Sequence, residues 1–161
     1  MGRTTANSRA WLLIAATLVS IVLLRAPDAN AQQGVRKEIY KVRLSPVPID
    51  VSMMAAIAGY GSLTATLSGK QLTISGTFEG LKSPATTGHI HRGFKGIRGP
   101  VIPNLDLSVS HAAKGSVSGS LELTPDQIAD LHAARLYVQI ESERAPDGNV
   151  WGWILPQDNS R

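Results

Sequence analysis

Apolar and polar positions alternate along much of this chain, and the alternation predicts β-strands. It is clearest in residues 62–67 and 71–78, where every second position is apolar or glycine and most of the others carry hydroxyl groups. Because successive side chains of a strand point to opposite faces, each segment has one face for a core and one for solvent. Ser68, Gly69 and Lys70 form a short connection between them, so we predict a β-hairpin.

Similar segments predict the remainder of a β-rich domain. Further strands are expected at residues 37–44, 85–91, 101–109, 116–123, 135–142 and 149–155, with a turn at 145–148. The Met- and Ala-rich residues 51–58 fit either a helical turn or an irregular crossover.

One short helix is expected among these strands. Thr124 has the properties of an N-cap, and Pro125 and Gln127 follow it at the first and third helical positions. We expect this helix to end near residue 134. Because strands and helices do not alternate, the pattern predicts an all-β fold, an antiparallel β-sandwich or barrel with one short helix.

The first thirty-one residues follow a different pattern, typical of an export signal. Arg3 and Arg9 precede a nearly uninterrupted apolar run over residues 11–24, which is too short to span a bilayer comfortably. Residues 29–31 read Ala-Asn-Ala, a small-x-small cleavage site. We expect a signal peptide over residues 1–31 that is cleaved after Ala31, and a secreted or periplasmic product; an uncleaved N-terminal anchor is the alternative.

Cleavage would leave a single domain over residues 32–161, with its core at about residues 40–156 and no permanent membrane span. The domain would have a net charge of +2 instead of the +4 of the whole chain. Nucleic-acid binding needs a concentrated basic face, so we expect no nucleic-acid partner. The chain has no cysteine, which excludes disulfides, thiolate nucleophiles and cysteine metal ligands.

Several motifs lie in an order that is found in a known family. They are Phe78-Glu79-Gly80-Leu81, Gly88-His89-Ile90-His91, Gly93, Gly96, Gly99-Pro100-Val101, Leu123-Thr124-Pro125-Asp126-Gln127, Leu136-Tyr137-Val138 and Pro146-Asp147-Gly148-Asn149-Val150-Trp151-Gly152. Together they resemble the CHRD domain, which is named for chordin and occurs widely in secreted bacterial proteins. The resemblance covers about residues 40–156. It implies an immunoglobulin-like β-sandwich and extracellular interaction roles, without a well-established reaction.

The chain departs from the family pattern at two places. Leu44-Ser45-Pro46-Val47-Pro48 replaces the usual "LSG…EVPP" opening. Glu141 follows Tyr137-Val138-Gln139-Ile140 where many members carry a histidine.

His89 and His91 are candidate metal ligands. On a strand they point to one face, where two imidazoles could share Zn²⁺ or Cu²⁺. The arrangement is similar to the copper-binding strand of Cu/Zn superoxide dismutase. A metal site needs a third ligand, for which Glu141 is the candidate, since His111 and His132 have no ligand spacing to His89. The alternative is that both histidines make structural hydrogen bonds beside the glycine-rich loop.

Two further groups are candidate binding residues. Arg92, Lys95 and Arg98 recur every third residue between glycines, a pattern that suits phosphate, sulfate or an acidic glycan. The alternative is a solvated turn. Trp151 and Trp153 share one strand face, where they could stack on a sugar or contact a protein; the alternative is that they fill the core or cap its end.

The sequence contains no Ser-His-Asp order, paired-carboxylate motif or nucleotide fingerprint that stands out. We therefore expect a secreted, non-enzymatic binding module without a cofactor. Its partner would be an extracellular protein, a glycan or another polyanion. The alternative function is that of a copper- or zinc-binding protein, with or without redox activity, that uses His89 and His91.

Overall fold

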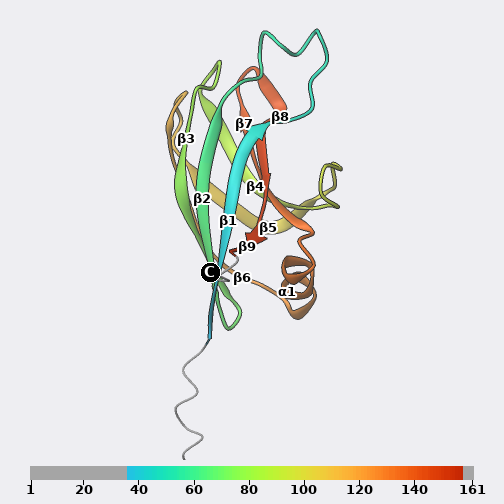
Figure 1. Cartoon of the computed structure of the whole chain (residues 1–161). Helices are drawn as coiled ribbons and strands as arrows, with labels where there is room; N and C mark the ends of the chain where they lie inside the picture. Colours follow the sequence, from blue (N-terminus) through green and yellow to red (C-terminus); the bar gives the residue numbers. More distant parts are fainter. Residues whose placement is uncertain (1–35, 158–161) are drawn as a thin grey trace, which may run out of the picture. The chain divides into compact units, whose positions relative to one another are not determined.

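The computed structural model of the chain describes residues 36–157 (Figure 1). The expected signal peptide and its cleavage after Ala31 lie outside these residues. The described elements, in chain order, are β1 (Lys37–Pro46), β2 (Tyr60–Ser68), β3 (Gln71–Glu79), β4 (Ala85–Arg92), β5 (Val101–Val109), β6 (Gly115–Glu122), α1 (Pro125–His132), β7 (Leu136–Ser142), β8 (Ala145–Trp153) and β9 (Leu155–Pro156).

Eight of the strands form a closed antiparallel barrel. They follow one another in the order β1-β2-β3-β6-β5-β4-β7-β8, after which β8 pairs with β1 and closes the ring. The short β9 pairs with the outer part of β1, at Tyr40 and Lys41. The predicted all-β class with one short helix is confirmed, but the predicted immunoglobulin-like β-sandwich is wrong.

The ring closes because two long strands change partners along their length. The first part of β1, through Leu44, pairs with β2, and Ser45 and Pro46 pair with β8. Similarly, β5 pairs with β4 at Val101, Asp106 and Leu107, and with β6 at Ser108 and Val109. Alternation along a strand determines which side chains face inward, but not which strand lies beside it. This change of partner is therefore not visible in the sequence pattern.

The barrel interior is filled by the inward half of the alternating positions. Examples from different strands are Val42, Leu63, Ile74, Ile90 and Val138, each at most 1 % exposed. Where β8 approaches β1, a side chain would not fit: a Cβ at Gly152 would lie 2.4 Å from the backbone oxygen of Arg43. Glycine at this position therefore allows the closing pair of strands to pack together.

The locally encoded elements form as predicted. β2 and β3 make the expected hairpin, with Leu67 opposite Leu72 and Gly69 in the left-handed region at φ 62°. Thr124 caps α1 through a capping box with Gln127, and the helix ends at His132, two residues before the expected end. The eight-residue α1, the one helix among residues 36–157, is too short to span a bilayer.

The connection between β7 and β8 is shorter than predicted. The turn was expected at residues 145–148, but Ala145 already pairs with Ser142, so that Glu143 and Arg144 form the turn. The ladder is irregular beside this turn, and Gly148 has a φ of 121°. The turn-forming residues of the sequence thus produce a distorted stretch of β8 instead of the reversal itself.

Candidate functional site

The candidate residues meet on the outer surface of the barrel wall formed by β5, β4, β7 and β8. Cross-strand pairing places His89 between Asp106 and Gln139, and Trp151 lies opposite Gln139 on the next strand. A second row, one step along the strands, begins with His91 and continues through Tyr137 and Trp153. Neighbouring inward positions on these strands, such as Ile90 and Val138, belong to the core, so the two rows face outward.

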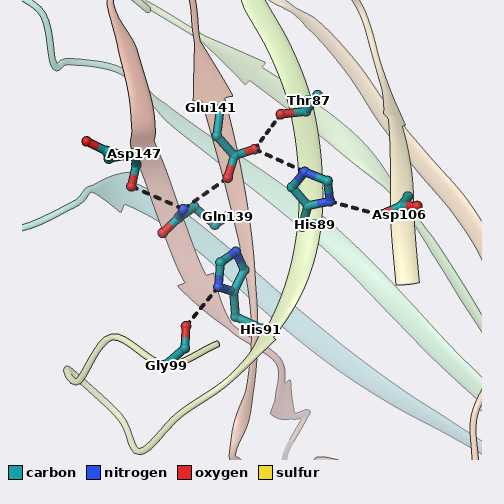
Figure 2. Close-up of polar contacts among 8 residues, drawn as sticks. All are labelled: Thr87, His89, His91, Gly99, Asp106, Gln139, Glu141 and Asp147. Atoms are coloured by element: carbon teal, nitrogen blue, oxygen red, sulfur yellow. Dashed lines mark hydrogen bonds and ion pairs between the residues drawn. The ribbon is translucent and has the colours of Figure 1, made fainter. Parts of the chain in front are cut away.

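A buried carboxylate lies at the centre of the polar part of this surface. Glu141 is 7 % exposed and accepts hydrogen bonds from Thr87 Oγ1 at 2.8 Å and from Gln139 Nε2 at 3.0 Å (Figure 2). His89 Nε2 lies 3.9 Å from Glu141 Oε2. A buried carboxylate needs donors to replace its lost hydration, and these two bonds supply them.

The two histidines are each held through Nδ1. His89 Nδ1 lies 2.9 Å from Asp106 Oδ1, and His91 Nδ1 lies 3.0 Å from the backbone oxygen of Gly99 (Figure 2). The His91 ring also stacks on Tyr137, with centroids 4.9 Å apart. A backbone oxygen only accepts hydrogen bonds, so we assign a proton to His91 Nδ1. His91 is 7 % exposed, and its Nε2 has no hydrogen-bond partner among the described residues.

The candidate metal ligands lie close together, but they do not form a complete metal-binding site. As predicted, His89 and His91 share a face, with ring centroids 6.5 Å apart, and Glu141 lies beside His89. However, no three His, Cys, Asp or Glu side chains within residues 36–157 surround a common point that could hold a metal ion. His111 lines a cavity with His89 and Asp106, whereas His132 pairs with Glu38 at 2.9 Å. The metal assignment stays a prediction.

Trp151 and Trp153 belong to a second apolar cluster that lies outside the barrel. Their ring centroids are 4.7 Å apart, and Tyr137 packs 4.8 Å from Trp153. The segment between β1 and β2 covers them with Val47 and Ile57. The two indoles are only 7 % and 9 % exposed, so each presents little more than an edge. The edges, together with Arg43 and Lys95, line a shallow cavity.

The sequence pattern did not indicate the role of Tyr137 in this cluster. Burial raises the pKa of the Tyr137 phenol, which therefore stays protonated. Its hydroxyl accepts a hydrogen bond from the backbone nitrogen of Gly99 at 3.0 Å and donates to the backbone oxygen of Gly99 at 3.2 Å. Tyr137 thus ties the barrel wall to the loop that follows β4. The sequence did contain one indication of this role: Tyr137 lies two residues before Gln139 on an alternating strand, so both side chains are on the same face.

The loop over residues 93–100, which we call the β4–β5 loop, projects from the side of the barrel (Figure 1). Arg92, at its base, forms an ion pair with Asp130 of α1. Arg98 Nη1 donates to the backbone oxygen of Asp147 at 2.8 Å, and Lys95 is exposed. The structure thus divides the three predicted cations: Arg92 is paired with a carboxylate, whereas Lys95 and Arg98 have no carboxylate within ion-pair distance among the described residues.

The same loop carries apolar side chains that the charge pattern did not single out. Phe94 and Ile97 are each 60 % exposed. Arg135, the residue just before β7, lies over the Phe94 ring with Cζ 4.8 Å from its centroid. The sequence indicates their exposure, because Phe94 and Ile97 stand among glycines and cations in a loop and not on the apolar face of a strand.

Comparison with known proteins gives one family. The model of the CHRD domain matches residues 44–154, which include nearly the whole barrel. No curated protein and no solved structure matches the chain.

Proposed function

We propose that this chain, which belongs to the CHRD domain family, is an exported, non-enzymatic module that binds an acidic extracellular partner through its β4–β5 loop. The family match supports a binding type of module. The export part of the proposal comes from the charged start, the apolar run and the Ala-Asn-Ala site of residues 1–31.

One observation carries the choice of surface: exposed cations gather at a loop whose backbone is fixed. Lys95, Arg98 and Arg135 are exposed there, and none of them is in an ion pair within the described residues. Such cations keep their charge available for a partner's phosphate, sulfate or carboxylate groups. An ordered loop also loses less conformational freedom on binding than a mobile one.

The other candidate surfaces support this choice by contrast. Trp151 and Trp153 are covered by the chain's own Val47 and Ile57, so a stacked sugar would find only their edges. In the polar cluster, Glu141 is occupied by Thr87 and Gln139. The β4–β5 loop is instead exposed from Phe94 through Arg98.

Elution from a heparin column tests the proposal. The protein is expressed from the full chain and purified from the cell fraction in which it accumulates. We expect Lys95→Glu/Arg98→Glu to elute at clearly lower salt than the unsubstituted protein. Lys70→Glu/Lys114→Glu makes the same change in net charge at two other connections of the barrel and serves as the matched control. Equal elution of the two double variants would refute the loop as the binding surface.

Mass spectrometry of the same preparation tests export. We expect the purified protein to begin at Gln32, with Ala31 as the last residue removed. A product that retains residues 1–31 in the membrane fraction would instead support the N-terminal anchor.

Metal binding is a second candidate function, and it is favoured by the unpartnered nitrogen of His91. With its proton on Nδ1, His91 has a buried acceptor at Nε2. His89 is also oriented through Nδ1, by a carboxylate, as is common for histidines that bind metal ions. Elemental analysis of protein purified without an affinity tag is the test. Stoichiometric zinc or copper that is lost in His91→Ala would support this function, and protein free of metal after mild dialysis would refute it.

A further inference from the structure

We infer that the acidic partner of the β4–β5 loop is an anionic lipid surface, with Phe94 and Ile97 entering the apolar side of the interface and the neighbouring cations meeting the headgroups. This inference rests on the proposed function and specifies its partner.

The first argument is the exposure of apolar side chains on the loop. Phe94 and Ile97 are each 60 % exposed, and Val101, just after the loop, is 44 % exposed. Single exposed apolar residues are common on protein surfaces. Here, however, Phe94, Ile97 and Pro100 line one shallow apolar cavity together. A soluble polyanion has no apolar environment in which these side chains could be buried. The boundary between lipid headgroups and acyl chains does accommodate aromatic and aliphatic groups.

The second argument is the charge around these side chains. Lys95 and Arg98 lie on the loop itself, and Arg135 lies over the Phe94 ring. Asp130 is engaged by Arg92, and among the described residues no carboxylate lies within ion-pair distance of Lys95, Arg98 or Arg135, since Asp147 contacts Arg98 only through its backbone oxygen. The surface around the apolar tip is therefore positive, as binding to anionic headgroups requires.

The third argument is that the loop already has a fixed shape. At its base, the backbone nitrogen of Gly93 donates to Arg135 O at 2.8 Å and that of Arg92 donates to Pro100 O at 3.0 Å. At its tip, the nitrogen of Ile97 donates to Phe94 O at 2.8 Å, and Gly96 has a φ of 84°, which a tight turn uses. Phe94 and Ile97 are thus the two ends of one turn, so their insertion needs little further ordering.

Sedimentation with lipid vesicles tests the inference. The protein purified from the full chain is mixed with vesicles of phosphatidylcholine alone or of phosphatidylcholine with phosphatidylglycerol. We expect binding to the mixed vesicles that weakens as salt is added, and little binding to phosphatidylcholine alone. We expect Phe94→Ser/Ile97→Ser to lower the partition coefficient about tenfold or more, because both apolar groups are lost from the interface.

Tyr60→Ser is the matched control. Tyr60 is 61 % exposed, nearly the same as Phe94, but it lies on β2, which is four strands away from β4 around the ring. We expect this variant to bind vesicles within about twofold of the unsubstituted protein. The Phe94→Ser/Ile97→Ser variant should keep its elution from heparin, because its cations are intact. Near-ultraviolet circular dichroism of the tryptophans confirms that each variant is folded.

The possible outcomes separate this inference from the proposed function. If the protein binds heparin but not the mixed vesicles, the lipid inference is wrong and the proposed function stands. If it binds neither, both are wrong. If Phe94→Ser/Ile97→Ser binds the mixed vesicles as well as the unsubstituted protein does, the apolar tip is not inserted and the inference is overturned.

Discussion

Side chains alternate between the inside and the outside of the barrel on all its strands, but the outer face is exposed on β3 and β6 and buried on β7. On β3 and β6 most of the outward side chains are serines and threonines in register across the two strands, such as Thr73 opposite Ser120 and Ser75 opposite Ser118, and these are exposed. On β7 both faces are buried along all seven residues. The outward Tyr137 of β7 is covered by the β1–β2 connection and the β4–β5 loop. The polar outward residues of β7 are contacted by side chains and backbone of the neighbouring strands β4 and β8.

The comparison shows that a strand's outer face becomes part of a site when other segments cover it. The exposed hydroxyl groups of β3 and β6 can form their hydrogen bonds with water. Buried outward groups must instead find partners within the protein, as Glu141 does with Thr87 and Gln139. The loop that Tyr137 anchors is the same loop that we propose as the binding surface. Substitutions on the two parts of the wall should therefore have very different effects.

The largest difference is expected between Trp153 and Thr73. Trp153→Ala removes a 9 % exposed indole from the outer cluster and takes away an aromatic ring that packs against both Tyr137 and Trp151. We expect it to lower the free energy of unfolding by about 3 kcal/mol, as for a core aromatic residue. Thr73→Ala on the bare face should change it by no more than about 0.5 kcal/mol. Urea denaturation measures both, and equal effects would mean that the outer cluster contributes no more stability than the bare face.

A smaller difference is expected between Glu141 and Ser118. Glu141→Ala removes the acceptor of the Thr87 hydroxyl and one of the two acceptors of the Gln139 amide. We expect it to lower the free energy of unfolding by about 2 kcal/mol, whereas Ser118→Ala on exposed β6 should have little effect. Glu141→Gln, which keeps one acceptor, should lie in between. A Glu141→Ala variant as stable as the unsubstituted protein would contradict a structural role for this carboxylate.

The smallest effect is expected at the end of the barrel near α1, and it depends on pH. Tyr40 donates to Glu38 at 2.6 Å, and this hydrogen bond, together with nearby His132, lowers the pKa of the Glu38 carboxyl. Since the folded-state pKa is lowered, the associated stability is present above the pKa of the unfolded state and is lost as pH falls through the folded value. Glu38 is 39 % exposed on its side chain, so solvent screening keeps the effect below about 1 kcal/mol.

Tyr40→Phe tests this effect by removing the donor. The variant should be less stable than the unsubstituted protein near neutral pH, and the difference should shrink as the pH is lowered past the Glu38 titration. Urea denaturation at a series of pH values measures it. A difference that is constant across the acid range would assign the effect to packing of the ring instead of to the carboxylate.

The sequence predicted what depends on neighbours along the chain. The β2–β3 hairpin follows from alternation on both sides of Gly69, and the start of α1 follows from Thr124 and Gln127. Alternation also placed His89 and His91 on one face. These features need only the geometry of a strand, a turn or a cap.

What the sequence did not predict depends on segments that meet in space. The closure of the barrel needs β1 and β5 to change partners, and no residue type marks that change. The burial of Trp151 depends on coverage by Val47 and Ile57, about a hundred residues earlier in the chain. The exposure of Phe94 depends on the absence of any cover for its loop. A pattern along one strand contains none of this information.

The places where β1 and β5 change partners have a mechanical consequence. The β5–β6 ladder has only two residue pairs, Ser108 and Val109 with Ser118 and Val117, whereas β1 is held by β8 at Ser45 and Pro46 and again by β9 at Tyr40 and Lys41. Regions with fewer shared contacts open at lower free energy, so we expect the β5–β6 ladder to be the weakest line of the wall. On heating or under tension we expect the ring to open there first, while β4, β5 and the loop between them stay joined to β7.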